Sequence, residues 1–274
     1  EDFFASLSNE SANKLRLAFA PLIELEQDAI THRNLEVLTC ILEHGSLEVS
    51  NIEHSFSCLS EQLGVVYNNL KTAKMADEQS LISRYYGGVY FSYKQAVDID
   101  IILEAIHQYI PANNRDLFLA ALLSTASDIV DTVGKHFAQP IKARDSKGNI
   151  KTTVYNKAAK DKTIDVLPLY RDWFEKYRAL TKNDLTHITM QGDFEQCLKS
   201  LPDNVKTVYA DPPYTRDHYS RFYHVLETLT LRDSPKISTV TTHGSTHVSN
   251  GIYRDDRHQS PFCIKSKAPA AFRK

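Results

Sequence analysis

The sequence predicts an α/β fold in its carboxyl-terminal third and a largely helical region before it. Over residues 1–182, apolar side chains recur at intervals of three and four residues, as they do in amphipathic helices. Over residues 186–230, the pattern changes to strand, short helix, strand and helix. Strands that alternate with helices are typical of α/β domains.

Five helical segments precede the α/β part. Ser8 or Asn9 is suited to cap the first helix, and Pro21 either kinks it or starts another. Asn113 or Asn114 is suited to cap the longest later helix. Residues 46–58 are polar, so we expect a loop there. The predicted helices cover residues 1–44, 61–74, 98–109, 115–137 and 166–182.

Two stretches of the helical region are candidates for contact with a ligand. Residues 85–93 contain five aromatic side chains, which form either a platform for stacking bases or a cluster packed under a loop. Residues 135–162 carry eight Lys and Arg against two Asp, with a turn at 146–149 and a predicted hairpin strand at 150–155. This basic hairpin either contacts phosphates or is an ordinary solvated loop.

The second predicted strand, residues 205–210, ends in Asp211-Pro212-Pro213-Tyr214. Two prolines cannot continue a ladder of backbone hydrogen bonds, so the strand stops there. The Asp211 carboxylate and the Pro212 carbonyl can each accept one N–H of an exocyclic amine on a nucleobase. Tyr214 offers a flat ring on which an extruded base can stack. The alternative is an ordinary turn after a strand.

Composition excludes several classes of protein. The 274 residues are 42% hydrophobic and 24% charged, with a net charge of −2, which excludes a globally basic nucleic-acid binder but allows a locally basic surface. We expect no membrane span and no metal site. The four cysteines are scattered, so we expect reduced thiols and a cytoplasmic location.

Glycine is scarce, with nine in the chain, and Gly87-Gly88 is the only adjacent pair. A nucleotide-binding turn requires clustered glycines, and none is found. We therefore expect that a segment bearing this turn precedes the sequence, and that the catalytic site as printed is incomplete.

The order Gly192-Asp193-Phe194, helix, strand, Asp211 to Tyr214, helix resembles the catalytic half of adenine-specific (N6) DNA methyltransferases that use S-adenosylmethionine. Residues 215–229, 251–262 and 86–96 strengthen the resemblance, which covers the last third well and the rest loosely. It implies a partial Rossmann-like methyltransferase sheet. It also implies that Asp211, Pro212, Pro213 and Tyr214 are catalytic.

The same resemblance assigns the remaining sites. Asp193, Phe194 and Asp211 are expected to bind the cofactor, S-adenosylmethionine. The implied partner is double-stranded DNA, with a cognate restriction endonuclease as a further one if the enzyme belongs to a restriction-modification system. The candidate DNA-binding residues are Lys142, Arg144, Lys147, Lys151 and Arg221.

Three regions follow from these assignments. Residues 1–110 form a mainly helical region, residues 111–185 a candidate DNA-recognition region, and residues 186–274 the catalytic half. Two alternatives stay open: an RNA base amino-methyltransferase, and a catalytically incomplete fragment that binds nucleic acid. The sequence gives neither the recognition sequence nor the oligomeric state.

Overall fold

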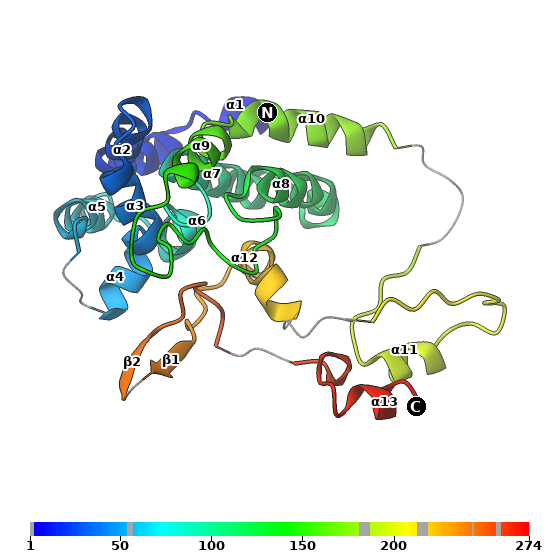
Figure 1. Cartoon of the computed structure of the whole chain (residues 1–274). Coiled ribbons are helices and arrows are strands. Elements are labelled where there is room, and N and C mark those ends of the chain that lie inside the picture. Colours follow the sequence, from blue (N-terminus) through cyan, green and yellow to red (C-terminus); the bar gives the residue numbers. More distant parts are fainter. Residues whose placement is uncertain are drawn as a thin grey trace.

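The computed structural model describes residues 3–53, 57–180, 187–212, 219–242, 244–255 and 259–273. Most of these residues form a helical body, with the β1–β2 hairpin projecting from its lower side (Figure 1). A smaller carboxyl-terminal part, which contains α11 and α13, lies to one side of that body (Figure 1). Helix α12, from the predicted catalytic half, packs on α6 and α8 of the helical body.

Helices make up most of the described residues. The longer ones are α2 (Glu10–Thr31), α3 (Leu35–His44), α5 (Ser60–Thr72), α7 (Tyr93–Tyr109), α8 (Arg115–Ile129), α9 (Thr152–Lys162), α10 (Val166–Arg178) and α12 (Tyr219–Leu231). The shorter ones are α1 (Phe3–Ser6), α4 (Leu47–Glu53), α6 (Leu81–Tyr86), α11 (Phe194–Lys199) and α13 (Ala268–Ala271). Single 3-10 turns lie at Asp77–Gln79, Ala112–Asn114 and Pro261–Cys263.

The core of the helical body is built around α7. This helix starts at a capping box, in which Ser92 and Gln95 each bond the other's backbone N–H. Helices α2, α6 and α8 pack against α7, and α10 packs on α8. Because α7 is covered on several sides, apolar and small residues all around it are buried, including Val97, Ile99, Ile102 and Leu103.

A buried ion pair joins α9 to α2. The Lys162 Nζ lies 3.0 Å from the Glu26 carboxylate, and both side chains are almost completely buried. Lys162 also donates to the carbonyls of Gly88 and Phe91, while Glu26 accepts the N–H of Tyr93. Because the Lys162 ammonium and the Glu26 carboxylate also bond these backbone groups, the pair fixes the turn between α6 and α7 as well as helices α9 and α2.

Several predicted elements differ from the observed ones. Residues 47–53 form α4 rather than a loop, and the first residue of this helix, Leu47, is buried. Helix α8 ends at Ile129 rather than near 137, because the Asp131 N–H bonds to the Tyr90 carbonyl and Gly134 and Lys135 adopt positive φ. Residues 150–155 do not form a hairpin strand, because Thr152 begins α9 and only an isolated bridge joins Arg144 to Ile150.

The predicted strands of the catalytic half are not formed in the described part. Residues 187–193 and 205–210 are irregular and exposed, and the only backbone bond found within 203–212 joins Val205 N–H to the Pro202 carbonyl. A strand needs a neighbouring ladder, and these segments have none there. The regular sheet among the described residues is the antiparallel hairpin of β1 (Thr239–Thr242) and β2 (Ser245–Val248), with Thr239 opposite Val248. The Rossmann-like sheet is therefore not confirmed.

Two further expectations can be compared with the structure. The prediction of reduced thiols is wrong for Cys40 and Cys58, which are disulfide-bonded with their Cα atoms 6.4 Å apart, while Cys197 and Cys263 are free. The spacing of the cysteines did not indicate this because α3 and the residues before α5 meet only in the fold. No described helix is long and apolar enough to cross a bilayer.

Candidate functional site

Asp211 and Pro212 stand at the end of the exposed segment 203–212. The Asp211 side chain faces solvent, and Pro212 is partly buried. Pro213 and Tyr214 lie outside the described residues. An exposed carboxylate next to a proline carbonyl is accessible to a large substrate, as the predicted chemistry requires.

Asp193 and Phe194 are positioned by the start of α11. Asp193 caps this helix, with its carboxylate accepting the Glu195 N–H at 3.0 Å, which leaves its other oxygen free of helix bonds. Phe194 is 41% exposed and meets Phe262 edge to face at 5.6 Å. Phe262 in turn contacts Phe272, the C-cap residue of α13, so three aromatic rings link α11 to α13.

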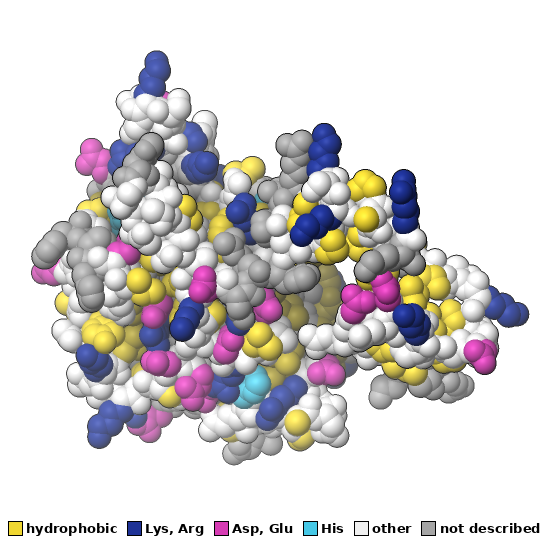
Figure 2. Space-filling model, turned by 90° about the horizontal axis from the view of Figure 1, so that it is seen from below, with side chains coloured by type: hydrophobic (Ala, Val, Ile, Leu, Met, Phe, Trp, Pro, Cys, Tyr) yellow, Lys and Arg dark blue, Asp and Glu magenta, His cyan; other side chains and the backbone are white. Residues whose placement is uncertain are grey.

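This carboxyl-terminal part exposes many apolar side chains. Tyr209 is 88% exposed, and the other exposed apolar side chains lie in the two predicted strands and in α11. They are Ile188, Met190, Phe194, Leu198, Val205 and Val208. Figure 2 shows apolar side chains gathered on the smaller part at its right. An apolar surface of this kind marks a place where another segment or molecule binds.

The Gly87-Gly88 pair is part of the core packing. Gly88 has a φ of +77°, and a Cβ on it would lie 2.8 Å from the Tyr93 hydroxyl and 3.1 Å from Gly45. Its carbonyl is taken by Lys162. The pair therefore allows two backbones to approach and does not bind a nucleotide. Among the described residues, Asp193 and Phe194 fit the adenosine end of a nucleoside cofactor, and no turn suited to its other end is found.

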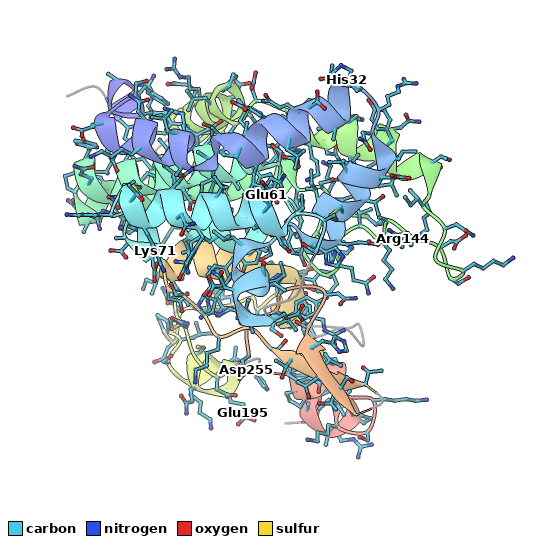
Figure 3. The ribbon with its side chains drawn as sticks, turned by 90° about the vertical axis from the view of Figure 1, so that its left-hand side faces the viewer. His32, Glu61, Lys71, Arg144, Glu195 and Asp255 are labelled. Atoms are coloured by element: carbon cyan, nitrogen blue, oxygen red, sulfur yellow. A yellow bond between two sulfur atoms is a disulfide. The ribbon has the colours of Figure 1, made fainter. Side chains whose placement is uncertain are left out.

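The predicted DNA-binding residues of the basic loop differ in whether their side chains are already bonded within the fold. Lys142 and Lys147 are exposed, whereas Arg144 pairs with Glu43 at 3.1 Å and bonds the Gly148 carbonyl. Lys151 donates to the Lys142 carbonyl. Figure 3 places Arg144 beside the helical body, well above Glu195 and Asp255. The structure does not bring this loop next to α11.

Arg221, the fifth predicted DNA-binding residue, lies on α12. Its guanidinium is 5.3 Å from the Tyr253 ring, and its Nε is buried without a hydrogen-bond partner in the described ranges. Part of the Arg221 guanidinium therefore packs within the fold, and its other nitrogens can donate to a ligand.

Sequence reasoning missed the residues that hold α12 in place. His224 is completely buried, with the rings of Tyr86, Tyr90 and Tyr253 edge-on to it at 5.1–5.7 Å. Burial raises the pKa of Tyr90 well above its ordinary value. The aromatic run 85–93 is therefore a packed cluster, and the alternative of an exposed stacking platform is wrong. Its apolar flanks were the signal that favoured packing.

Arg254 is the second residue that was not assigned. It makes two short bonds to the Asp233 carboxylate, at 2.7 and 2.6 Å, and one to Thr228 of α12. The pKa of Asp233 is lowered by the hydrogen bonds from Arg254. The mixed charges of residues 253–257 therefore include an ion pair within the fold. Residues 256–258 lie outside the described part.

Comparison with known proteins gives one family. Residues 135–255, somewhat under half of the chain, match the sequence model of D12 class N6 adenine-specific DNA methyltransferases. This segment runs from the basic loop through Asp211 to the Arg254 ion pair. The comparisons with curated proteins and with solved structures gave no match.

Proposed function

We propose, from the premise that residues 135–255 are a D12 class N6 adenine-specific DNA methyltransferase region, that this protein methylates N6 of adenine in double-stranded DNA. The observation that supports the proposal most directly is the position of Asp211-Pro212 inside the matched segment, with the Asp211 carboxylate exposed.

Asp211 and Pro212 would act on the amino group. Its nitrogen is a poor nucleophile because its lone pair is delocalised into the ring. One N–H is donated to the Asp211 carboxylate and the other to the Pro212 carbonyl. These two bonds favour a pyramidal nitrogen, whose lone pair is no longer delocalised into the ring and can point at an electrophile. Two acceptors held in these positions are the arrangement that stabilises a transition state most effectively. Tyr214 would stack on the extruded adenine.

Asp193 and Phe194 would hold the adenosine end of S-adenosylmethionine, whose chemistry is to supply the methyl group when bound. The free oxygen of Asp193 can accept an amino N–H, and the half-exposed Phe194 ring can contact the base. We also propose that residues 186–191 and 205–210 form strands of a Rossmann-like sheet in the active protein. Their exposed apolar side chains support this, since a sheet would cover them.

The DNA partner follows from the same premise. Lys142 and Lys147 are the exposed cations of the matched region that are best suited to phosphates, and Arg144 and Lys151 can add to them if their present partners release them. A methylated target sequence is protected from cleavage, so we propose a cognate restriction endonuclease as the partner in a restriction-modification system.

The test is transfer of a labelled methyl group from S-adenosylmethionine to duplex DNA by the purified protein. We expect label in N6-methyladenine, and we expect Asp211→Ala to lower the rate at least ~100-fold because one of the two acceptors is lost. DNA binding should change by less than about twofold, since an exposed side chain is removed. Asp203→Ala, which removes an exposed carboxylate of the same segment 203–212, is the control.

Three other outcomes would contradict the proposal. Label in structured RNA and not in duplex DNA would favour the RNA methyltransferase. Salt-dependent retention of DNA with no methyl transfer by the parent protein would favour a binding fragment without catalysis. Full activity of Asp211→Ala would remove the assigned role of this carboxylate.

A further inference from the structure

The first two turns of α12 display an aromatic face toward solvent. Tyr219, Phe222 and Tyr223 are spaced by three and four residues, so they share one side of the helix. The ring of Tyr219 lies 5.5 Å from that of Tyr223 and 6.4 Å from that of Phe222. Tyr219 is 37% exposed and Tyr223 is 50% exposed. We call these three residues the α12 aromatic face.

The opposite side of α12 is anchored, so the aromatic face cannot turn into the core. Val225 and Leu229 are completely buried, and α12 packs on α6 and α8 (Figure 1). The Thr228 hydroxyl lies 3.0 Å from that of Tyr86 and also accepts from Arg254. Rotating the helix to bury Tyr223 would expose these groups. The exposure of the aromatic rings is therefore built into the fold.

A loop around His136, near the start of the matched region, packs against the α12 aromatic face. The His136 ring lies 5.0 Å from that of Phe222. His136 is held in place by two hydrogen bonds. Its backbone N–H donates to the Thr132 hydroxyl, and its ring Nδ1 accepts the backbone N–H of Ala138. Gly134 has a φ of +82°, which lets the loop pass close to the His136 ring. Phe222 is thus backed by protein, and Tyr223 is the outermost ring.

The position in the chain limits how far this face can lie from Asp211-Pro212. Tyr219 follows Pro212 by seven residues, so their Cα atoms are no more than about 25 Å apart even with the chain fully extended. Arg221 lies between the aromatic residues in sequence and supplies a positive charge that suits a polyanion, whereas Lys135 of the nearby loop is paired with Asp161. The family match, which covers both elements, makes DNA that polyanion.

We propose that Tyr223, supported by Tyr219 and Phe222, stacks on the bases left unpaired when the target adenine leaves the duplex. This inference rests on the proposed function, because it assumes that DNA is the substrate. Extruding a base leaves a gap in the stack and an orphan base opposite it. A ring that fills this gap recovers about 1–3 kcal/mol per base. Tyr223 is therefore a positioning residue, and Asp211 remains the group that acts on the amine.

The test measures binding to a duplex that already contains the gap. The probe is a duplex with one abasic nucleotide opposite thymine, compared with the intact duplex at the same ionic strength, since binding depends on salt. We expect the parent protein to prefer the abasic duplex by about 5- to 100-fold, which corresponds to the stacking free energy. Tyr223→Ala should lower this preference to near unity, and Tyr223→Phe, which keeps the ring, should retain it.

The matched control is Tyr67→Ala on α5. Tyr67 is a partly buried helical tyrosine with the Lys71 cation over its ring, and it lies outside the family match. It should leave both affinities unchanged. An equal loss of affinity for both duplexes in Tyr223→Ala, or an undiminished preference, would overturn the inference.

Methyl transfer separates this inference from the proposed function. On duplexes around adenines that the parent protein is found to methylate, Tyr223→Ala should lower kcat/KM about 5- to 100-fold when the target adenine is paired. The loss should be at most about threefold when it faces an abasic site, because there is no orphan base to stack on. No transfer by the parent protein contradicts the proposed function alone, and the binding experiment still decides the role of Tyr223.

Discussion

Asp131 is fully buried where the chain leaves α8, and neither carboxylate oxygen has a hydrogen-bond partner among the described residues. Burial raises its pKa to about 6; the nearby cations of Lys162 and Lys157 oppose this shift, and the carboxylate of Asp161 adds to it. A buried carboxylate without a donor is costly when ionised. The protein therefore carries an unfavourable charge in its core at neutral pH.

The pH dependence of stability should reveal this charge. Between about pH 4 and 6 the native state holds a proton on Asp131 that the unfolded chain releases, so the free energy of unfolding falls as pH rises. With a pKa raised by about two units, this loss is about 3 kcal/mol and is complete above about pH 7. Asp131→Asn does not titrate, so its stability relative to the parent should increase by that amount between pH 4 and 7.

Urea unfolding at several pH values measures the effect. Asp172→Asn, which removes an exposed carboxylate on α10, controls for the change in net charge. A constant difference between parent and Asp131→Asn over this range would show that the carboxylate is solvated or paired in solution.

At the scale of elements, the Lys162–Glu26 pair is the link whose loss should affect the most structure. Lys162→Met leaves the Glu26 carboxylate buried without its cation, which costs about 3–5 kcal/mol. Adding Glu26→Gln removes that charge while keeping an acceptor for the Tyr93 N–H, and should recover at least ~1 kcal/mol. A double-mutant cycle by urea unfolding checks this, and strict additivity would contradict the coupling.

The elements also show what local patterns can predict. Helix α5 was predicted within two residues at each end because its apolar spacing is regular over three turns. Helix α9 was mistaken for a strand because Thr152, Thr153 and Val154 are β-branched, although Val154 and Ala158 are buried four residues apart. Tertiary contacts outweighed local propensity there.

The candidate site divides in the same way. Asp211-Pro212 could be recognised because its chemistry lies in consecutive residues. The pairing of Arg254 with Asp233 joins residues 21 apart, and the ring contacts of His224 join it to Tyr86 and Tyr90, more than 130 positions away. No spacing rule connects such residues, since only the packing of α6 against α12 brings them together.

At the scale of the whole molecule, the two parts differ in how their backbones are satisfied. The helical body pairs its backbone in helices around a common core, whereas residues 187–193 and 203–210 expose both backbone and apolar side chains. Local stability follows the number of buried contacts and protected hydrogen bonds. Residues 187–193 and 203–210 should therefore open far more easily than the body, which would suit segments that assemble around cofactor and DNA.

Hydrogen exchange should show this difference and its reversal. In the free protein, amides of α2 and α7 should exchange slowest, with opening free energies near the global value, while those at 205–210 exchange with opening free energies near zero. When S-adenosylmethionine and duplex DNA are added together, we expect amides at 205–210 to become protected, because strand pairing would then bury Val205 and Val208. The β1–β2 hairpin, already paired, is the internal reference. Slow exchange at 205–210 in the free protein would mean that a sheet exists before ligands bind, and unchanged fast exchange with both ligands would contradict the proposed sheet.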